Sequence, residues 1–439
     1  MAPAVSAGRS LVLELYEAGL AAAAPGELTA RAVDELSIAR ASRVWVFAFG
    51  KAAQPMAAAA VASLLRGMHS VVGGLVVSPE GGPAPYPTLI SMRGDHPIPG
   101  RNSFAAAVKI GEVTPGRRSN DVAIVLLSGG ASSLIGAPLR GMNEFDLTLL
   151  FEQLLGSGLD IVAMNAVRKR FSRWSAGRLA LALAPAATHC LAISDVPNDD
   201  MAVIGSGPCV PDSVTVKEVT EILQRSNLLS HIPQTHRDYL SAVARGLIPE
   251  TPTKAHPAFA HVSSRVIGNN RLALDGIAAH AHERSLAAEV ADQRTIGEAA
   301  RVGETIARTL ISARAASPGR CFVWGGETTV TLAANSGHAS GGGRCQEMAL
   351  AAARILHDAG EHGTGITLLA AGTDGRDGAT DAAGAIVDST TWAAVAAAGR
   401  DPAQSLASHE SHGALRGANA LIPQRETGTN VNDVIIGVV

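Results

Sequence analysis

The segment Asp121–Ser133, with the sequence DVAIVLLSGGASS, decides the fold class of this chain. Its uninterrupted apolar run from Ala123 to Leu127 indicates a strand buried on both faces, as in a parallel sheet. The glycines that follow allow backbone N–H groups to approach a ligand closely, and the serines add hydroxyl donors. Because open α/β sheets bind ligands at the carboxyl ends of their strands, the segment predicts a binding loop. An ordinary turn between a strand and a helix is the alternative.

The composition narrows the class of protein. The chain has 439 residues, of which 47% are hydrophobic and 3% aromatic, and it contains 46 glycines, which favours an α/β enzyme of two or three domains. With a formal net charge of −3, the chain has no overall positive potential that would attract nucleic acid or an anionic membrane. We expect neither a signal peptide nor a membrane span, because charged residues interrupt the N-terminal apolar residues and no apolar run is long enough. The four cysteines lie far apart without a CxxC pair, which argues against a zinc site or a disulfide framework and favours a cytoplasmic location.

Other predicted strands end in similar polar loops. Arg43–Gly50 (RVWVFAFG) predicts a buried strand that turns at Lys51 into an alanine-rich helix. Lys51 would then lie at a helix N-terminus, where unpaired N–H groups already favour an anion, although a solvated lysine is the alternative. Another apolar strand ends at Ser194 and continues as DVPNDDMAVIGSGP, in which Asp195 offers the carboxylate oxygens that Mg²⁺ needs beside substrate phosphates.

Two further segments of the first half carry candidate site residues. The stretch Asn165–Pro185 predicts one helix with five basic residues, which are Arg168, Lys169, Arg170, Arg173 and Arg178. Such a helix usually has a solvated basic face, but one of its arginines could hold a carboxylate or phosphate bidentately. The loop GDHPIPG contains Asp95 and His96, which are either substrate contacts or part of a rigid proline-bracketed turn.

The second half of the chain predicts a second α/β unit. The proline-rich segment Leu247–Phe259 is the best linker candidate, and His261–Gly268 (HVSSRVIG) follows it as the first strand of this unit. A later strand, CFVWGGETTVTL, is interrupted by Gly325, Gly326 and Glu327. The loop SGHASGGGRCQE brings Arg344 to the start of a helix, and a further strand ends in TDG at Asp374.

The absence of several fingerprints limits the chemistry. No G-x-G-x-x-G follows a strand, so a nicotinamide dehydrogenase is poorly supported, and Lys51 lacks the upstream glycine of a P-loop. The sequence also lacks H-E-x-x-H and G-x-S-x-G. The remaining set of glycine- and serine-rich loops, cations and strand-end carboxylates favours phosphoryl transfer. A sugar-acid-binding protein without chemistry is the alternative.

Ordered motifs along nearly the whole chain carry a resemblance to a known family. They include FGKAAQPM, GDHPIP, LLSGGASSL, NAVRKRFS, SDVPNDDMAVIGSGP, GGETTVTL, GGGRCQE, GTDGRDGATDAAGAIVD and TGTNVND. With them the sequence resembles the bacterial glycerate 2-kinases with a MOFRL C-terminal domain, which are historically also labelled hydroxypyruvate reductases. The resemblance implies an ATP- and Mg²⁺-dependent kinase that phosphorylates D-glycerate at the 2-hydroxyl.

The resemblance also implies an architecture. We expect a Rossmann-like three-layer α/β domain over residues 1–245, a linker over 246–258, and a smaller mixed α/β domain of MOFRL type over 259–439. The active site would lie in the cleft between the two domains. A homodimer is possible, and the sequence predicts neither a nucleic-acid nor a membrane partner.

The motifs assign candidate roles to individual residues. Lys51, Arg344 and Asp195 are the catalytic candidates; Lys51 and Arg344 would contact the substrate or the transferring phosphate, and Arg168 is a further substrate-binding candidate. Asp195 and Asp374 are the metal candidates, chosen for their strand-end positions. The candidates for binding the nucleotide are Ser128, Gly129, Gly130, Ala131, Ser132, Ser133, Gly325, Gly326 and Glu327.

The chain departs from the family pattern at several loops. Cys345 follows the motif arginine where the family usually has asparagine, and Ser175-Ala176-Gly177 replaces the usual Lys-Gly-Gly. The lost lysine removes one possible phosphate or carboxylate contact. A kinase for another small hydroxy acid therefore stays open beside the glycerate kinase, as does an NAD(P)H-dependent hydroxypyruvate reductase.

Overall fold

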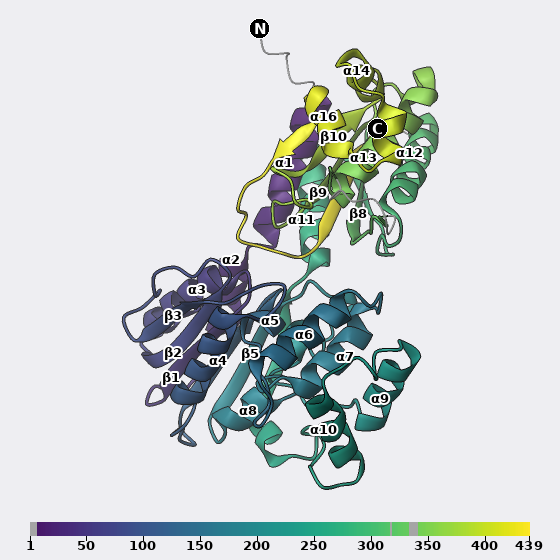
Figure 1. Cartoon of the computed structure of the whole chain (residues 1–439). Coiled ribbons are helices and arrows are strands. Elements are labelled where there is room, and N and C mark those ends of the chain that lie inside the picture. The colour runs from purple at the N-terminus through teal and green to yellow at the C-terminus, as the bar shows by residue number, and fades with distance from the viewer. Residues whose placement is uncertain (1–6, 317, 333–340) are drawn as a thin grey trace. The chain divides into compact units, whose positions relative to one another are not determined.

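The computed structural model describes residues 7–316, 318–332 and 341–439. Its contacts divide the chain into two compact units (Figure 1). Pro25–Gly268 forms the first, which we call the parallel-sheet unit, and the segments 1–24 and 269–439 together form the second, the mixed-sheet unit. Residues 336–340 of the predicted Gly-rich loop before Arg344 lie outside the described residues. Among the residues described, no helix is long and apolar enough to cross a membrane.

The parallel-sheet unit contains a six-stranded sheet in the order β3-β2-β1-β4-β5-β6, in which every neighbouring pair is parallel. Its strands are β1 (Arg43–Phe49), β2 (Ser70–Ser78), β3 (Leu89–Arg93), β4 (Val122–Leu127), β5 (Ala187–Ile193) and β6 (Val262–Gly268). All six residues of β4 are buried, as the apolar run predicted. This strand order is that of the doubly wound Rossmann fold, and it confirms the predicted fold class.

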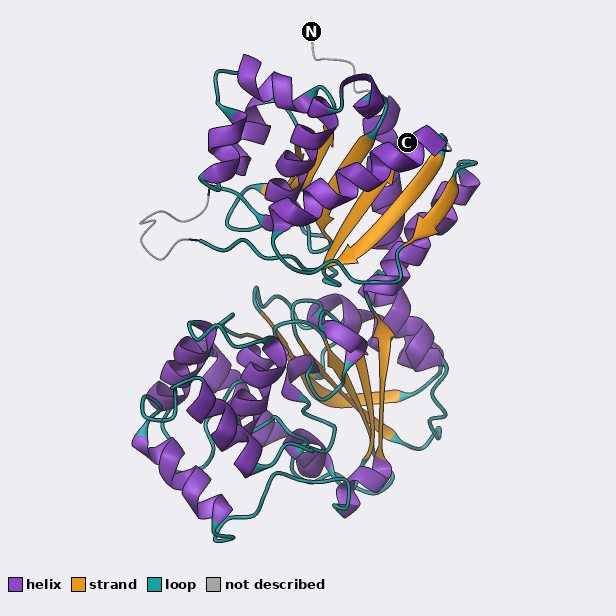
Figure 2. Ribbon diagram, turned by 90° about the vertical axis from the view of Figure 1, so that its right-hand side faces the viewer, coloured by secondary structure: helices purple, strands orange, loops and turns teal. Residues whose placement is uncertain are grey.

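Helices cover both faces of this sheet (Figure 2). The unit contains α2 (Pro25–Asp34), α3 (Ala53–Arg66), α4 (Arg101–Val113), α5 (Ala131–Leu134), α6 (Glu144–Leu155), α7 (Ile161–Phe171), α8 (Arg178–Leu183), α9 (Val216–Arg225) and α10 (Gln234–Ala244). Helix α6 begins where the Asn143 side chain accepts from the Asp146 N–H. Residues of α6, α7, α9 and α10 share a separate apolar cluster that includes Phe151 and Phe171. Apolar packing in this cluster holds α7 in place.

The mixed-sheet unit contains a second six-stranded sheet, in the order β11-β10-β9-β12-β8-β7. Its elements are α1 (Ala7–Ala22), α11 (Asn270–Glu283), β7 (Ala287–Val290), α12 (Ala299–Ala316), β8 (Arg320–Gly326), α13 (Arg344–Asp358), β9 (Thr367–Gly372), β10 (Ala382–Asp388), α14 (Thr391–Ala397), α15 (Pro402–Ala407), α16 (Ser411–Gly417), β11 (Leu421–Pro423) and β12 (Asp433–Val438). Only β7 and β8 pair in parallel; the other pairs are antiparallel. The mixed α/β character of this half is therefore confirmed.

The division of the chain differs from the expected boundaries at 245 and 259. Strand β6 pairs with β5 as the last strand of the parallel sheet, so it does not begin the second unit, and the proposed linker 246–258 lies within the first. Helix α1 packs on α11 and on the sheet of the mixed-sheet unit, where the Tyr16 hydroxyl donates to the Gly372 carbonyl at 2.6 Å. Both differences arise from long-range packing, which local sequence patterns do not report.

Candidate active site

The predicted glycine–serine loop lies at the point where the order of the parallel sheet reverses. β1 and β4 are neighbours, with β2 and β3 on one side and β5 and β6 on the other. The backbone N–H of Lys51, which follows β1, donates to the Gly129 carbonyl at 2.9 Å, and the Ala52 N–H donates to the Ser128 hydroxyl at 3.0 Å. Doubly wound sheets bind their ligands at this switch point. The structure thus brings Lys51 and the Ser128–Ser133 loop together.

Two glycines permit this close approach. Gly50 has φ +134°, and a Cβ built there would lie 2.1 Å from the Ser128 Oγ atom. Gly130 has φ +87°, and its Cβ would lie 2.8 Å from Cδ2 of His96. At both positions a side chain would be strained by the backbone and would collide with the loop.

The serine hydroxyls of this loop have defined partners. Ser128 Oγ accepts from Ala52, and Ser133 Oγ donates to the Gly130 carbonyl at 3.1 Å, so both stabilise the turn. Ser132 Oγ lies 2.8 Å from Ser206 Oγ, which joins this loop to the polar loop that the sequence predicted after Ser194. Two loops that are distant in sequence therefore meet at the predicted binding loop.

The basic segment 165–185 is not one helix. Helix α7 ends at Phe171, and the Arg178 guanidinium donates to the carbonyls of Lys169, Arg170 and Ser172 at its end. Positive φ at Ala176 and Gly177 then turns the chain into α8. Arg178 is thus a structural cap for α7. The prediction of a continuous helix was wrong because this cap and the positive φ at Ala176 and Gly177 end α7 and redirect the chain.

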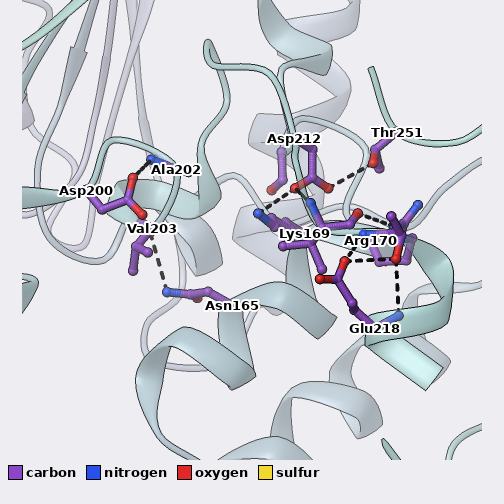
Figure 3. A network of polar contacts seen from close by, with 12 residues as sticks. Asn165, Lys169, Arg170, Asp200, Ala202, Val203, Asp212, Glu218 and Thr251 are labelled. Atoms are coloured by element: carbon purple, nitrogen blue, oxygen red, sulfur yellow. Dashed lines mark hydrogen bonds and ion pairs between the residues drawn. The ribbon is translucent and has the colours of Figure 1, made fainter. Parts of the chain in front are cut away.

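Two other basic side chains of α7 are paired inside the protein (Figure 3). Lys169 Nζ lies 2.6 Å from the Asp212 carboxylate, which also accepts from the Thr251 hydroxyl at 2.9 Å. Arg170 is fully buried and pairs with Glu250. These contacts tie α7 to the segment before α9 and to the segment after α10, and they leave neither charge for a ligand.

Arg168 differs from its neighbours on α7. It is only 8% exposed, and its guanidinium carbon lies 4.8 Å from the centre of the Phe151 ring. Within the described ranges of the chain, no carboxylate pairs with it, its buried Nε has no hydrogen-bond partner, and its one polar contact is with the Met164 sulfur at 4.0 Å. Burial lowers the pKa of Arg168 to about 10. A buried, unpaired guanidinium is the arrangement expected of an anion receptor.

His96 is a candidate site residue whose role the sequence left undecided. Its neighbour Asp95 caps α4, accepting from the Asn102 N–H at 2.8 Å, and is therefore structural. The imidazole of His96 instead lies against Gly130. Displacement of water by the surrounding protein, together with the positive charges of Lys51 and Arg168, lowers the pKa of His96 to about 4, although part of the residue remains open to solvent. The three side chains thus share one electrostatic environment.

Asp195 lies just beyond the carboxyl end of β5 and is half-buried. The loop that follows it contains three non-glycine residues with positive φ: Asn198, Asp199 and Ser206. Such strained backbone is concentrated at functional sites. No group of three His, Cys, Asp or Glu side chains arranged for a metal is found in the part of the chain that the structure describes.

Arg344 lies in the mixed-sheet unit, at the first residue of α13. Its guanidinium donates to both carboxylate oxygens of the buried Asp433, at 2.6 and 2.9 Å, and Nη1 lies 2.9 Å from the half-exposed Glu327 carboxylate. Burial alone would lower the pKa of Arg344, but the bonds to Asp433 raise it, so the group stays charged. Arg344 is therefore fixed by one buried acid and one exposed acid.

The other predicted residues of this unit have packing partners. A Cβ at Gly325 would lie 1.9 Å from the Asn270 side chain, and one at Gly326 would lie 2.2 Å from the Thr295 carbonyl, so both glycines allow close backbone packing. Asp374 is half-buried and accepts from the Arg376 N–H at 3.1 Å. Asp377 was not among the site predictions, yet it accepts from the Cys345 and Gln346 N–H groups and caps α13. Gly343, where a Cβ would lie 2.2 Å from the Asp377 side chain, is the sequence signal for this close packing.

The two sheets define a two-domain α/β protein, and the switch-point loops with the cations around them form a candidate small-anion site on its Rossmann-like sheet. The model described as "Domain of unknown function (DUF4147)" matches residues 11–241, and the "MOFRL family" model matches residues 320–433. The chain belongs to the glycerate 2-kinase family.

Individual relatives span almost the whole chain. The D-glycerate 2-kinase of Thermotoga maritima is 34% identical over 436 residues, covering 98% of both proteins. A protein of Agrobacterium vitis called putative hydroxypyruvate reductase is 34% identical over 431 residues, covering 97% of this chain and 93% of the relative. The crystal structure of glycerate kinase from Thermotoga maritima superposes with a TM-score of 0.83 at 34% identity, covering 98% of this chain and 99% of that one.

Proposed function

We propose that this chain transfers the γ-phosphoryl group of ATP to the 2-hydroxyl of D-glycerate, giving 2-phospho-D-glycerate and ADP. Family membership and the relatives called glycerate 2-kinase support the reaction class. The choice of substrate rests on Arg168, which is buried and has no acidic partner among the described residues. Its positive charge, together with that of Lys51, lowers the pKa of His96. A small carboxylate such as glycerate fits this requirement, because it would supply the missing counter-charge.

The proposed division of labour follows from these positions. Arg168 binds the glycerate carboxylate, the Ser128–Ser133 loop holds the nucleotide phosphates through backbone N–H groups, and Lys51 stabilises the negative charge that develops on the transferring group. Arg344 remains a proposed second cation. Because Glu327 already pairs with it and is half-exposed, a phosphate would have to replace that carboxylate.

Mg²⁺ is proposed as the metal that accompanies ATP, where it would neutralise charge on the phosphates. Mg²⁺ is commonly held by one or two carboxylates with waters and phosphates, so the lack of a three-ligand cluster among the described residues is compatible with it. Asp195, a hard oxygen donor at a strand end of the parallel sheet, is the candidate ligand there. Asp374 is the corresponding candidate on the mixed sheet.

The experiment that tests this function measures ATP consumption by the purified protein with Mg²⁺ and D-glycerate, with phosphorus NMR of the product. We expect a 2-phosphoglycerate signal. Removing the Lys51 ammonium in Lys51→Ala should lower kcat by roughly 10²–10³-fold if it acts mainly in the transition state. ATP consumption only with other hydroxy acids would change the proposed substrate. NADPH oxidation by hydroxypyruvate without any kinase activity would refute the proposal.

Location and assembly belong to the same proposal. We propose a cytoplasmic enzyme; the four cysteines are all free and buried, which is compatible with a reducing compartment. A homodimer stays a prediction that light scattering of the purified protein would test.

A further inference from the structure

We propose that His96 accepts the hydrogen bond of the substrate hydroxyl that attacks ATP, and that it thereby selects which hydroxyl of glycerate is phosphorylated. This inference rests on the proposed kinase function and adds a group that touches the reacting atoms.

The geometry places the imidazole beside the phosphate loop. A Cβ on Gly130 would lie 2.8 Å from Cδ2 and 3.2 Å from Nε2 of His96, so the ring rests on the backbone of that residue. The Lys51 N–H bonds to the carbonyl of the preceding residue, Gly129. His96 and Lys51 therefore contact adjacent residues of one turn at the switch point of the sheet.

The loop that carries His96 is anchored on its other side. Asp95 accepts from the backbone N–H and the side-chain amide of Asn102, both at 2.8 Å, and its own N–H donates to the Ser103 hydroxyl at 2.8 Å. These bonds fix the backbone next to His96 to the start of α4. The Asp95 carboxylate is thus engaged with that helix, and the imidazole is positioned by a rigid neighbour.

The ring has the properties of an acceptor. Within the described part of the chain, neither of its nitrogens makes a hydrogen bond to the protein. The charged groups that act on it are Lys51, at the end of β1, and Arg168, on α7, and both oppose protonation. The imidazole is therefore neutral near pH 7, with one nitrogen available as an acceptor.

The step balances as an in-line displacement. The glycerate hydroxyl oxygen forms a bond to the γ-phosphorus while the bond to the bridging oxygen breaks, and ADP leaves with that electron pair. The hydroxyl proton passes to the free nitrogen of His96 and then to water, which reaches the partly exposed residue. Arg168 would hold the glycerate carboxylate at a fixed distance from the His96 imidazole. Because the 2-hydroxyl and the 3-hydroxyl lie at different distances from that carboxylate, this spacing would select one of them.

The test uses the full-length protein as the variants His96→Gln and His96→Ala, with His261→Gln, an exposed histidine of the same unit, as the matched control. We expect kcat of His96→Gln to fall about 10²-fold with less than a threefold change in KM for D-glycerate, because Arg168 still binds the carboxylate. Phosphorus NMR should show 3-phosphoglycerate beside 2-phosphoglycerate in both His96 variants. Wild-type kcat should fall on acidification toward pH 4, and this fall should be absent from His96→Gln.

Wild-type kcat and unmixed product in His96→Gln would overturn the proposal. A fall in kcat matched by an equal rise in KM and a lower melting temperature would also overturn it, because it would indicate a structural role. These outcomes differ from failure of the proposed function, in which the wild-type protein itself would not phosphorylate any hydroxy acid.

Discussion

At the scale of single residues, Gly116 and Gly130 have similar backbone conformations in different surroundings. Their φ values are +78° and +87°, but a Cβ at Gly116 meets nothing within 4 Å, whereas one at Gly130 meets the His96 ring. Comparing the two positions therefore separates backbone strain from displacement of a site residue.

Gly130→Ala should reduce both stability and activity, and Gly116→Ala should reduce stability alone. In each variant an alanine with left-handed backbone conformation lowers the free energy of unfolding by about 1 kcal/mol. Gly130→Ala also displaces the imidazole and should lower kcat at least tenfold. Urea unfolding and steady-state kinetics of both variants measure this. Equal activity of the two variants would contradict the proposed contact.

We expect Arg168 to lower the stability of the folded protein and to be required for substrate binding. Arg168→Met removes a buried guanidinium whose Nε has no partner, so we expect the free energy of unfolding to rise by about 1–3 kcal/mol. The same change should raise KM for glycerate by roughly 10–100-fold, because a charge-assisted carboxylate contact is lost. Chemical denaturation and kinetics test both, with the exposed Arg225→Lys as control. A destabilised variant with unchanged KM would refute the role.

At the scale of elements, α7 combines structural and candidate functional charges in three consecutive residues. The sequence showed that the segment is basic, but not which charge would remain unpaired. Lys169 and Arg170 have partners more than 40 residues away in the chain, and that pairing depends on the tertiary fold. Prediction of the site from sequence was therefore limited by these distant carboxylates.

Lys169→Met should destabilise the parallel-sheet unit by about 3–5 kcal/mol. It leaves Asp212 buried without its counter-ion, although the Thr251 and Val214 hydrogen bonds remain. The double variant Lys169→Met with Asp212→Leu should recover most of the loss, since no buried charge is then uncompensated. Thermal and urea unfolding of the two variants give the answer; a double variant no better than the single one would argue against this account.

His236 on α10 gives this unit a specific sensitivity to acid. It is fully buried, its ring centre lies 4.4 Å from that of Phe171, and burial lowers its pKa to about 4. Below about pH 6.5 this histidine binds a proton in the unfolded chain but stays neutral in the folded protein. The free energy of unfolding should therefore fall between about pH 6.5 and pH 4 and become constant below pH 4. The loss is about 3 kcal/mol at most. His236→Leu should flatten this part of the pH–stability curve, and an unchanged curve would contradict the assignment.

At the scale of the whole molecule, the sequence predicted both kinds of sheet and most of their strands. The apolar run Ala123–Leu127 marks a buried strand of the parallel sheet. The same runs do not say which sheet a strand joins, and β6 was assigned to the wrong unit for that reason. Strand β10 was not predicted as a separate strand, because four of its seven residues are alanine or glycine, which have a low strand propensity. The place of Lys51 beside the Ser128–Ser133 loop was predictable in part, since both follow strands of a parallel sheet.

The two units should differ in their ability to fold as fragments. Residues 25–268 form a continuous unit and should fold alone. Residues 269–439 lack α1, whose Val12, Leu15, Tyr16 and Leu20 are buried in that unit, and burial of such side chains contributes about 1.5–3 kcal/mol each. This fragment should therefore lack cooperative unfolding until a peptide of residues 1–24 is added. Circular dichroism during denaturation of the two fragments tests this prediction. Cooperative unfolding of the fragment 269–439 by itself would refute it.

The position of α1 also sets an order of events during synthesis. The ribosome makes α1 before the parallel-sheet unit, yet the packing surface of α1 on α11 and the second sheet is translated only after that unit. That sheet stays incomplete longer still, because β12 inserts between β9 and β8 and is its last strand in the chain. Nascent chains thus carry an exposed apolar helix through most of their translation, which makes α1 the segment on which a chaperone would act.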